Sequence, residues 1–432
     1  MADPLFQSLP GFRDFIPSEC AIRNYLFETW RDVARRCGYA EYETPILEDT
    51  GLYLKKSGGE LAAQLFRFED QGGRDVTLRP EVTASLARLV AQHQRNFPKP
   101  IKWFEIGQCF RYEKPQKGRG REFHQFNVDI LGEAGPGADA ELIALAIETM
   151  LAFGFVAGDF MVRVSDRKAW VDFAQARGIA DADVPDFLGI IDKLEREKPE
   201  ALAAKLAALG LTPEAVREFI AHPPATASAA YQAIFADLSA RGYADFVKLD
   251  LSIVRGLAYY TGVVFEVFDA RQAMRAVAGG GRYDTLVATI SDGATDLPAT
   301  GFAMGDYVIR NLIEETTHAA MQMEVWLRRN AAACEVFVVV ADDERRAEAL
   351  RLVTALRRAG IAADLPLTAA KVAKQFQSAE RSGARFALVI GAEYPVLKLK
   401  VLASRAEETG HADTAVDWLT ARLQEPDGPL LA

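Results

Sequence analysis

Alternating apolar and polar positions over residues 101–131 predict two strands joined by a polar loop. The first strand runs into Arg111, and the chain returns as a second strand from Phe123. The loop between them is charged and contains proline and glycine, so it is too polar to be buried. The pattern therefore predicts a hairpin with two arginines, Arg111 and Arg121, at its mouth and a carboxylate, Glu113, beside the first.

The returning strand, residues 123–131, carries different side chains on its two faces. Successive side chains of a strand point to opposite faces, so residues two apart share a face. One face is apolar, and the other presents Gln125, Asn127 and Asp129. A strand that only packs against a core has no need of a polar residue at every second position. This polar row is therefore expected to line something polar.

The rest of the first 165 residues alternates helices and strands. Helical spacing predicts amphipathic helices over residues 17–37, 84–95 and 138–153. Strand patterns cover residues 39–47, 65–68, 76–79 and 159–165. Pro45 cannot donate to a strand ladder, so the first of these strands is expected at an edge or a subunit boundary. Glu81 and Thr83 lie where a strand becomes a helix, a common position for ligand contacts.

Residues 166–245 differ in character from the segments around them. They are alanine-rich, helical in period and broken by glycine and proline, which predicts a helical insertion. Strand signals resume at residues 248–253 and 263–268, and a glycine run, Gly279–Gly281, precedes further helices.

From about residue 335 the chain alternates strands with helices. Strands are expected at residues 336–341, 362–365 and 386–390, and helices at 344–359 and 371–382. This alternation predicts a small α/β domain with mostly parallel strands. Its surface charges are mixed, so its composition alone indicates no ligand.

Composition narrows the class of protein. With 432 residues, 50% of them apolar, the chain is long enough for two or three domains. A formal net charge of -10 argues against a surface that coats nucleic acid by being basic throughout, although it leaves room for a local basic groove. The 4 cysteines are scattered singly, which fits a reducing compartment. No basic flank precedes an apolar core at the start and no long apolar run occurs, so we expect a soluble, cytoplasmic protein that does not enter a membrane.

Arginines and glycines from separate segments indicate an anion-binding pocket. Arg111, Arg121 and Arg255 each offer a planar fork that binds carboxylate or phosphate oxygens. Gly279–Gly281 lets a backbone approach a ligand closely, but no dinucleotide or P-loop fingerprint surrounds it.

A second set of side chains is suited to an ammonium group and a further hydrogen-bonding group. Its members are Glu81, Thr83, Gln125, Asp129, Tyr260 and Tyr283. Together with the arginines they describe a pocket for an amino acid and a polyphosphate. A carboxylate that attacks an α-phosphate builds up negative charge at phosphorus, and guanidinium groups placed in advance stabilise that charge.

Several of these segments resemble the class II aminoacyl-tRNA synthetases, and most closely the histidyl-tRNA synthetase family, over nearly the full length of the chain. The segments that carry the resemblance are Gly11–Asp14, the first class motif around Pro45, Leu78–Thr83, Phe110–Glu113 with Arg121–Gln125, Val254–Tyr260 and Gly280–Asp284. They are specific enough in combination to be hard to meet by chance.

The resemblance implies an α+β fold, in which an antiparallel sheet of the class II type is flanked by helices. It implies a catalytic domain at residues 1–165 and 246–325, a helical insertion at 166–245, and a C-terminal α/β domain of the anticodon-binding type at 334–432. It also implies a homodimer, because the first class motif is a dimerisation element in that family.

The resemblance further implies that histidine is activated with ATP to histidyl-adenylate and then transferred to the 3′ end of tRNA(His). Residues for histidine follow from the matching motifs. Glu81, Thr83 and Gln125 would hold the ammonium group and backbone. Asp129 and Tyr260 would read the imidazole, and Tyr283 would close the pocket.

Residues for ATP follow in the same way. Arg111 would hold the α-phosphate and the carboxylate, and Glu113 would accept from the adenine amino group, with Arg121 also binding ATP. Arg255 would assist the phosphoryl chemistry beside the histidine carboxylate. Mg²⁺ would accompany ATP.

Three positions depart from the family pattern. Ala258 stands where aspartate is usual, Val82 where glycine is common, and Val308 where an arginine normally touches ATP, while Arg310 lies two residues further on a different side of a helix. These departures leave a second interpretation open: the non-catalytic, histidine-sensing regulatory subunit of ATP phosphoribosyltransferase, a paralogue with the same fold. The retained hairpin and C-terminal domain favour the synthetase.

Some of these residues also have an interpretation that involves no ligand. Arg111, Glu113 and Arg121 could instead form a solvated ion-pair cluster on the hairpin. His124 is expected to be structural, because it faces away from Gln125 on the alternating strand. Only one of Tyr259 and Tyr260 can face a pocket, and we expect it to be Tyr260.

Overall fold

The computed structural model describes residues 6–56, 59–114, 116, 118–194, 197–223, 229–253, 260–271 and 274–424. The chain divides into two compact units, Met1–Met323 and Glu324–Ala432, which are described separately. Within the described ranges, every helix is too short or too polar to span a lipid bilayer.

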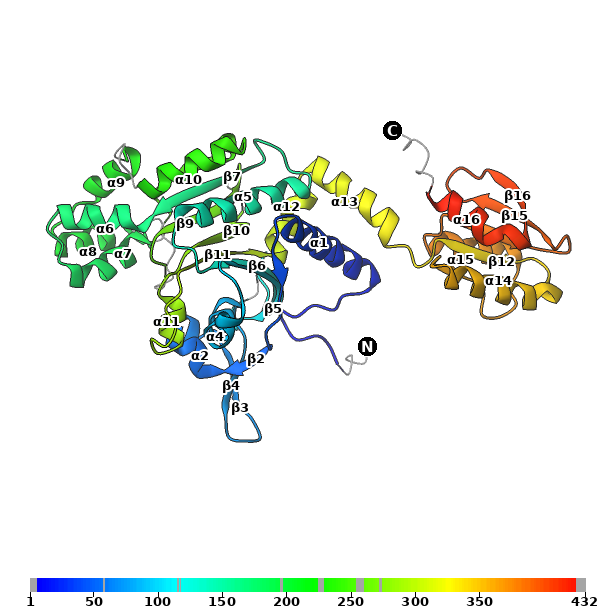
Figure 1. The fold of residues 1–432 in the computed structure, drawn as a ribbon, viewed down its shortest axis with the longest axis horizontal. Coiled ribbons are helices and arrows are strands. Elements are labelled where there is room, and N and C mark those ends of the chain that lie inside the picture. The colour runs from blue at the N-terminus through cyan, green and yellow to red at the C-terminus, as the bar shows by residue number, and fades with distance from the viewer. Residues whose placement is uncertain are drawn as a thin grey trace. The chain divides into compact units, whose positions relative to one another are not determined.

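The first unit is built on an eight-stranded sheet (Figure 1). Its strands, in spatial order, are β1 (Ala40–Glu41), β5 (Ile101–Phe110), β6 (Glu122–Leu131), β11 (Ala299–Gly305), β10 (Ala278–Arg282), β9 (Val263–Asp269), β7 (Phe160–Asp166) and β8 (Val247–Leu249). The outer pairs, β1 with β5 and β7 with β8, are parallel, and the inner pairs are antiparallel. The predicted α+β class is confirmed, and the predicted hairpin is β5–β6.

Helices lie on both faces of this sheet (Figure 1). α1 (Pro17–Arg36) and α5 (Pro136–Ala152) lie on one face, where Trp30 of α1 stacks on Phe126 of β6 with ring centroids 5.5 Å apart. α2 (Thr50–Lys56), α4 (Thr83–His93) and α11 (Leu286–Ile290) lie on the other. There Leu86 and Val90 of α4 are buried in one cluster with Leu131. After β11 the chain enters α12 (Asp306–Glu315) and then α13 (Thr317–Asn330).

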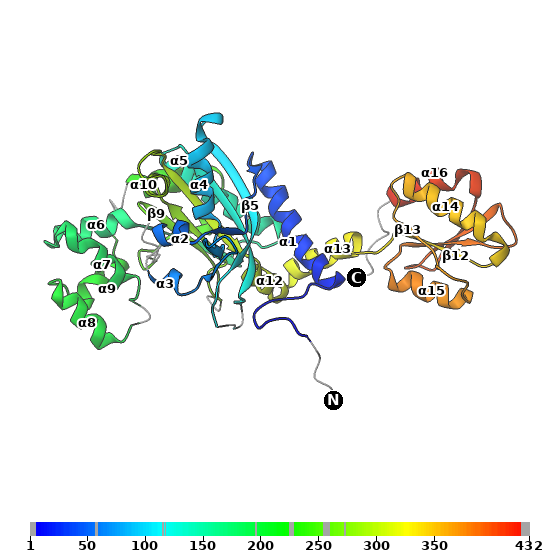
Figure 2. The ribbon, with the colours of Figure 1, turned by 90° about the horizontal axis from the view of Figure 1, so that it is seen from below.

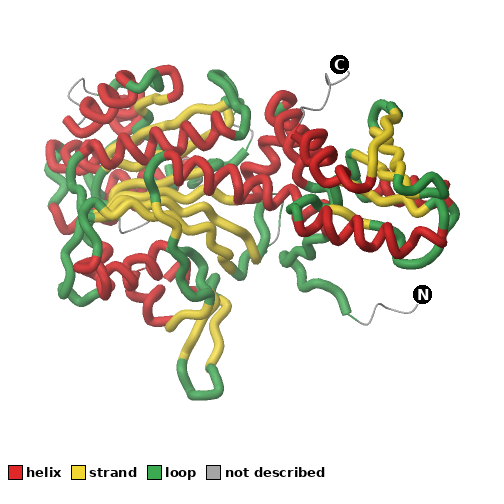
Figure 3. The backbone as a smooth tube through the Cα atoms, turned by 45° about the vertical axis from the view of Figure 1, so that its right-hand side comes forward, coloured by secondary structure: helices red, strands yellow, loops and turns green. Residues whose placement is uncertain are grey.

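The segment expected as a single strand over residues 39–47 is two short strands in different sheets. β1 belongs to the large sheet, whereas β2 (Leu47–Asp49) pairs with β4 (Asp75–Leu78), which also pairs with β3 (Phe66–Glu69). Pro45 lies between β1 and β2, and because proline has a fixed φ and no N–H it cannot continue the first ladder. The β3–β4 hairpin projects from the rest of the unit (Figure 3). Its two strands lie within one residue of the ranges predicted for them.

Residues 167–221 form four short helices with a core of their own (Figure 2). They are α6 (Arg167–Ala176), α7 (Val184–Ile191), α8 (Pro199–Ala208) and α9 (Pro213–Ala221). Trp170, Phe173 and Phe187 lie at the centre of this core. α10 (Ala229–Ala240) packs on α5 instead. The assignment of this region as a separate insertion domain stays a prediction.

The strand expected at residues 248–253 is shorter than its pattern indicated. β8 ends at Leu249, and the Asp250 carboxylate accepts hydrogen bonds from the backbone N–H and the hydroxyl of Ser252. A local bond of this kind closes a turn and competes with the strand ladder, so the strand ends at Leu249, before Asp250.

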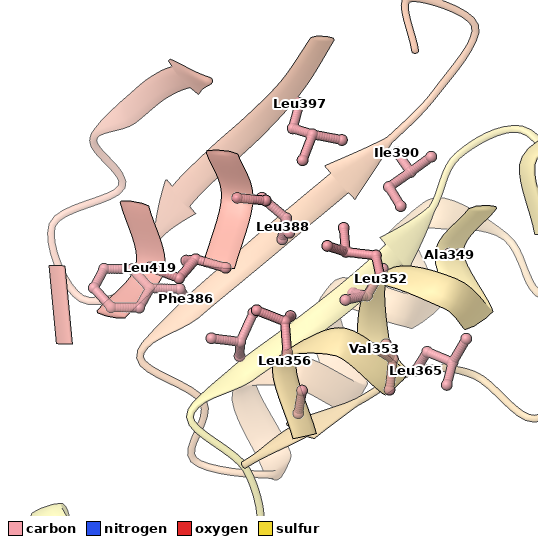
Figure 4. Close-up of a cluster of buried hydrophobic side chains, with 14 of the residues drawn as sticks. Ala349, Leu352, Val353, Leu356, Leu365, Phe386, Leu388, Ile390, Leu397 and Leu419 are labelled. Carbon is pink, nitrogen blue, oxygen red and sulfur yellow. The ribbon is translucent and has the colours of Figure 1, made fainter. Parts of the chain in front are cut away.

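The second unit has a five-stranded sheet in the order β13 (Ala363–Asp364), β12 (Val336–Val340), β14 (Phe386–Ile390), β15 (Val396–Val401) and β16 (Glu407–His411). The first three are parallel, as predicted, but β15 and β16 add an antiparallel edge that the sequence analysis did not anticipate. α14 (Arg346–Arg358), α15 (Val372–Arg381) and α16 (Ala415–Gln424) flank the sheet. Leu352 and Leu356 of α14 meet Leu388 of β14 in a buried apolar cluster (Figure 4).

Candidate functional site

The polar row of β6 faces a hollow because small residues flank it on the next strand. On β11, Gly301 lies opposite Asp129 and Ala303 lies opposite Asn127. Residues directly opposite each other in an antiparallel pair project from the same face, so a missing or short side chain leaves space beside its partner. A Cβ added at Gly301 would come within 1.9 Å of Asp129 Oδ1. The hollow therefore requires glycine at this position.

This hollow is a pocket of about 470 Å³, including space that is open to solvent. Side chains expected from the sequence contribute to its lining: Glu81, Thr83, Arg111, Gln125, Asp129, Tyr260 and Tyr283. They come from the start of α4 and the turn before it, the β5–β6 hairpin, the segment before β9 and the residue after β10. The fold thus brings together polar groups that lie far apart in the sequence.

Tyr283 and Asp129 form a fixed pair in the pocket. The Tyr283 hydroxyl donates to Asp129 Oδ1 over 2.5 Å, and each residue is only 2% exposed. The adjacent Arg282 is anchored away from the pocket, where its guanidinium lies 2.7 Å from the Asp139 carboxylate of α5 and donates to the backbone oxygen of Glu133. Burial raises the pKa of the Asp139 carboxyl, although Arg282 acts in the opposite direction. The strand end that carries Tyr283 is therefore held in place by α5.

Arg111 supplies the cation among the described residues of the lining. Its Nε donates to the backbone oxygen of Pro80 over 3.0 Å, and its guanidinium lies 5.2 Å from the centre of the Phe123 ring. The side chain is half-buried. These contacts fix a planar, two-pronged cation at the pocket wall, which is the arrangement that suits carboxylate and phosphate oxygens.

A buried ion pair supports the segment that carries Glu81 and Thr83. Arg79 Nη1 lies 2.5 Å from Glu105 Oε1, and Arg79 Nε donates to the backbone oxygen of Gln108 over 2.7 Å. Burial raises the pKa of the Glu105 carboxyl, while the charge of Arg79 acts against that rise. A buried pair of this kind holds its geometry only when its remaining donors are also bonded, and here backbone oxygens accept them.

Val82, one of the departures from the family pattern, fits because of Gly107. Val82 is fully buried, and a Cβ added at Gly107 would lie 2.7 Å from Val82 Cγ2. The glycine on β5 therefore leaves room for the valine at the start of α4.

Arg121 and Glu113 at the hairpin mouth are not among the described residues that line the pocket, whereas Arg111 is. Arg121 Nε donates to the backbone oxygen of Glu113 over 3.1 Å, and the Arg121 guanidinium stacks 4.2 Å above the Tyr112 ring. The Glu113 carboxylate pairs with Arg119. Glu113 thus pairs with a residue outside the expected cluster of Arg111, Glu113 and Arg121, and the roles of Glu113 and Arg121 toward ATP stay predictions.

Arg255, Ala258 and Tyr259 lie outside the described residues, so the role of Arg255 in the site stays a prediction. Arg310 is bound by two carboxylates, Glu19 of α1 at 2.5 Å and Glu314 at 2.8 Å. These partners hold Arg310 at the contact between α1 and α12.

His124 lies on the face of β6 opposite the pocket, as predicted. Its ring packs edge-on against Phe27 at 5.0 Å, and its Nδ1 lies 3.7 Å from Asp306 Oδ2. Arg13 pairs with the same carboxylate at 2.6 Å. Burial acts to raise the pKa of Asp306, but the hydrogen bond from His124 and the charge of Arg13 outweigh it and hold the pKa below its ordinary value.

The predicted site left out five lining residues: Asn127, Gly279, Gly301, Phe302 and Ala303. Asn127 belongs to the polar row of β6, and its side chain, 2% exposed, lines the pocket between Gln125 and Asp129. The alternation of the strand was the signal that could have identified it. Within the described ranges, no group of three His, Cys, Asp or Glu side chains is arranged to hold a metal ion.

Two family models match the chain. The model of histidyl-tRNA synthetase matches residues 11–306, and that of an anticodon binding domain matches residues 335–422. Histidine--tRNA ligase of Opitutus terrae is 40% identical over 425 residues, which cover 93% of this chain and 95% of that protein. The chloroplastic/mitochondrial histidine--tRNA ligase of Arabidopsis thaliana is 36% identical over 411 residues, 91% of this chain and 82% of that protein.

Solved structures show the same similarity. Histidyl-tRNA synthetase from Nostoc sp. PCC 7120 superposes with a TM-score of 0.78 at 25% identity and covers 97% of this chain and 100% of its own. An ATP phosphoribosyltransferase regulatory subunit/histidyl-tRNA synthetase from Bacillus halodurans superposes with a TM-score of 0.67 at 23% identity, covering 88% and 97%, which shows a shared fold.

Proposed function

The chain belongs to the histidyl-tRNA synthetase family, and from this premise we propose that it joins histidine to tRNA(His) at the expense of ATP. The observation that carries the proposal is the pocket beside β6, where an arginine, two acidic side chains and two tyrosines converge. An amino acid offers an ammonium group, a carboxylate and a side chain, and these groups match that lining.

Histidine is proposed to bind along the polar row. Glu81, Thr83 and Gln125 would accept from or orient the ammonium group at one side of the pocket. Asp129 and Tyr260 would contact the imidazole at the other side. The Tyr283 hydroxyl donates to Asp129 and so fixes the orientation of that carboxylate before the substrate arrives.

ATP is proposed to bind next to Arg111. A histidine carboxylate oxygen attacks the α-phosphorus, the bond to the pyrophosphate oxygen breaks, and pyrophosphate leaves with its electron pair. Arg111 and Arg255 would stabilise the charge on the α-phosphoryl oxygens in this step. Glu113 and Arg121 would hold the adenine and the triphosphate, and Mg²⁺ would accompany ATP, coordinated mainly by phosphate and water oxygens.

The second step is proposed to use the activated histidine directly. A ribose hydroxyl at the 3′ end of tRNA(His) attacks the acyl carbon of the histidyl-adenylate, an ester bond forms, and AMP leaves. The match of residues 335–422 to an anticodon binding domain supports tRNA as the acceptor. A homodimer, a cytoplasmic location and the boundaries of the catalytic and insertion domains belong to the same proposal.

The histidine-sensing regulator is kept as a second function because of Val308. Val308 stands at the usual arginine position, and Arg310 is bound by Glu19 and Glu314. A regulator would keep the histidine contacts and lose nucleotide chemistry. The anticodon binding domain favours the ligase, since a histidine sensor has no use for it.

Histidine-dependent exchange of pyrophosphate into ATP separates the two functions. The ligase predicts exchange by the wild-type chain, and Arg111→Ala should lower its rate about 100- to 1,000-fold because a donor to the reacting phosphate is lost. Arg217→Ala is the matched control, since Arg217 is exposed on α9 and pairs only at the surface with Glu214.

The same assay defines failure. A folded wild-type chain that binds histidine but catalyses no exchange would identify the regulator. Equal exchange by wild type and Arg111→Ala would remove the proposed role of this arginine.

A further inference from the structure

The side chain of Asn127 leaves a buried acceptor in the pocket. Asn127 is 2% exposed and lines the pocket, and none of the described residues donates a hydrogen bond to its Oδ1. Buried polar atoms in folded proteins nearly always have a partner, because water is lost on burial and nothing else replaces it. An acceptor without a donor at the wall of a pocket therefore requires an explanation.

The neighbours of Asn127 explain why the protein itself supplies no donor. Across the β5–β6 ladder, Asn127 lies opposite Glu105, whose carboxylate is engaged by Arg79 and Thr44. Across the β6–β11 ladder it lies opposite Ala303, which has no polar side chain. Side chains at the two flanking positions thus supply no donor to the amide oxygen, which is buried in the wall of the pocket.

The position of Asn127 along β6 places it between the two proposed ends of the substrate. Strand residues are spaced by about 3.4 Å, so Asn127 lies roughly 7 Å along the strand from Gln125 and from Asp129. An amino acid that spans the row from an ammonium group to an imidazole passes over this residue.

We propose that Asn127 Oδ1 accepts a hydrogen bond from an N–H of the bound amino acid and so selects histidine over side chains of similar shape without that donor. The inference rests on the proposed function insofar as the pocket binds histidine. It adds a specificity-determining contact that none of the matching motifs assigned. Sites built to hydrogen-bond a substrate N–H discriminate strongly against analogues that lack it, because the acceptor is then left buried and unpaired.

The test compares Asn127→Leu with wild type and with a control. Leucine keeps the approximate volume and removes the acceptor. Ser165→Ala is the matched control, because Ser165 on β7 also has a buried oxygen that receives no hydrogen bond from the described residues, and it does not contribute to the pocket lining. Binding of histidine is measured by calorimetry without ATP, together with the Tm of each ligand-free protein.

Two results are expected together. Asn127→Leu binds histidine about 10- to 100-fold more weakly than wild type. Its ligand-free Tm stays equal to or above that of wild type, since a buried polar group without a partner has been removed. Ser165→Ala binds histidine within about twofold of wild type. A residue with only a structural role would not lower affinity while preserving or raising Tm.

Two analogues identify the donor. Thienylalanine keeps the ammonium group and lacks the ring N–H, whereas imidazolepropionate keeps the ring and lacks the ammonium group. If the ring N–H donates, Asn127→Leu weakens imidazolepropionate and spares thienylalanine; if the ammonium donates, the pattern is reversed. The first pattern supports the proposed selection, whereas the second would overturn it, because every amino acid carries the ammonium group.

Unchanged histidine affinity in Asn127→Leu would overturn the inference, and would mean that water occupies the acceptor. Equal losses for histidine and both analogues would overturn it as well, since they would report a change of pocket shape. Because binding is measured without ATP, this outcome is independent of exchange: a chain that binds histidine through Asn127 but shows no exchange would refute the ligase alone.

Discussion

The two faces of β6 carry the same strand geometry and have opposite surroundings. On the face toward α1, Phe126 is covered by the stacked ring of Trp30 and the edge of Phe104, and all three are fully buried. On the face toward α4, Asp129 lies beside Gly301 and forms a pocket wall. The first face is filled by aromatic rings, and the second is kept empty by residues without large side chains.

This difference shows that a polar row alone does not make a site. Polar side chains on β6 can reach a ligand only because the residues directly opposite them on the neighbouring strand β11 are small and leave space beside them. His124 makes the same point from the other face. It is polar and lies among aromatic rings, yet its partner is Asp306, a fixed side chain of the protein.

Removing the Trp30 ring should have the largest effect of the changes considered, and it should lower stability without changing histidine affinity. Trp30→Ala is expected to lower the free energy of unfolding by about 3–5 kcal/mol, because it opens a large cavity under Phe126. Urea denaturation measures this loss. Histidine affinity, measured where the variant is folded, should stay within about twofold of wild type. Trp30→Phe, which keeps an aromatic ring, should lose less stability, and a large loss of affinity in either variant would show that the two faces are coupled.

Adding one carbon on the pocket face of the sheet should instead act mainly on histidine binding. Gly301→Ala is expected to weaken histidine binding about 10- to 100-fold, since its Cβ would displace the Asp129 carboxylate. Gly305→Ala is the control on the same strand, because a Cβ there meets no atom within 4 Å. Calorimetric titration of both variants tests the idea, and equal affinities would contradict the need for glycine at 301.

The polar contact on the apolar face should produce the smallest effect and a pH dependence. Asp306→Asn is expected to cost about 1–3 kcal/mol at pH 7, because it removes a charged acceptor from Arg13 and His124. The pKa of Asp306 is lowered on folding, so its contribution is fully present above the ordinary aspartate pKa of about 3.9 and is lost as pH falls through the folded value.

Thermal unfolding of wild type and Asp306→Asn between pH 7 and pH 3 measures that dependence. The gap in Tm should narrow on the acid side. Asp32→Asn serves as the control, because Asp32 is exposed and pairs with Arg36 of the same helix. A gap that widens with acid would show that the sign of the pKa shift is wrong.

The alternation of β6 predicted which of its side chains would share the pocket, because a period of two holds wherever a strand is regular. The facing glycine at 301 could not be deduced from that strand, since register between distant segments depends on the whole sheet. The same limit explains the break at Pro45. The sequence shows that Pro45 has no N–H. It does not show that the strand before Pro45 joins the large sheet and the strand after it joins another sheet.

Local contacts account for the remaining differences. Arg121 and Glu113 have the residue types of a nucleotide site, yet in this structure Arg121 bonds the backbone of Glu113, and residue type does not reveal such a partner. In the second unit, β15 was missed because its six residues alternate lysine with apolar side chains after a turn, a pattern too short to stand out. Tertiary pairing with β14 stabilises it.

The contact between Val82 and Gly107 has a consequence for how this family's motifs are compared. The two residues come from different segments and fill one space between them, so a chain with glycine at the first position has room for a side chain at the second. An exception at either position, taken alone, therefore says little about loss of activity. The combined size of the side chains at positions 82 and 107 shows whether the space between them is still filled, which the residue at either position alone does not.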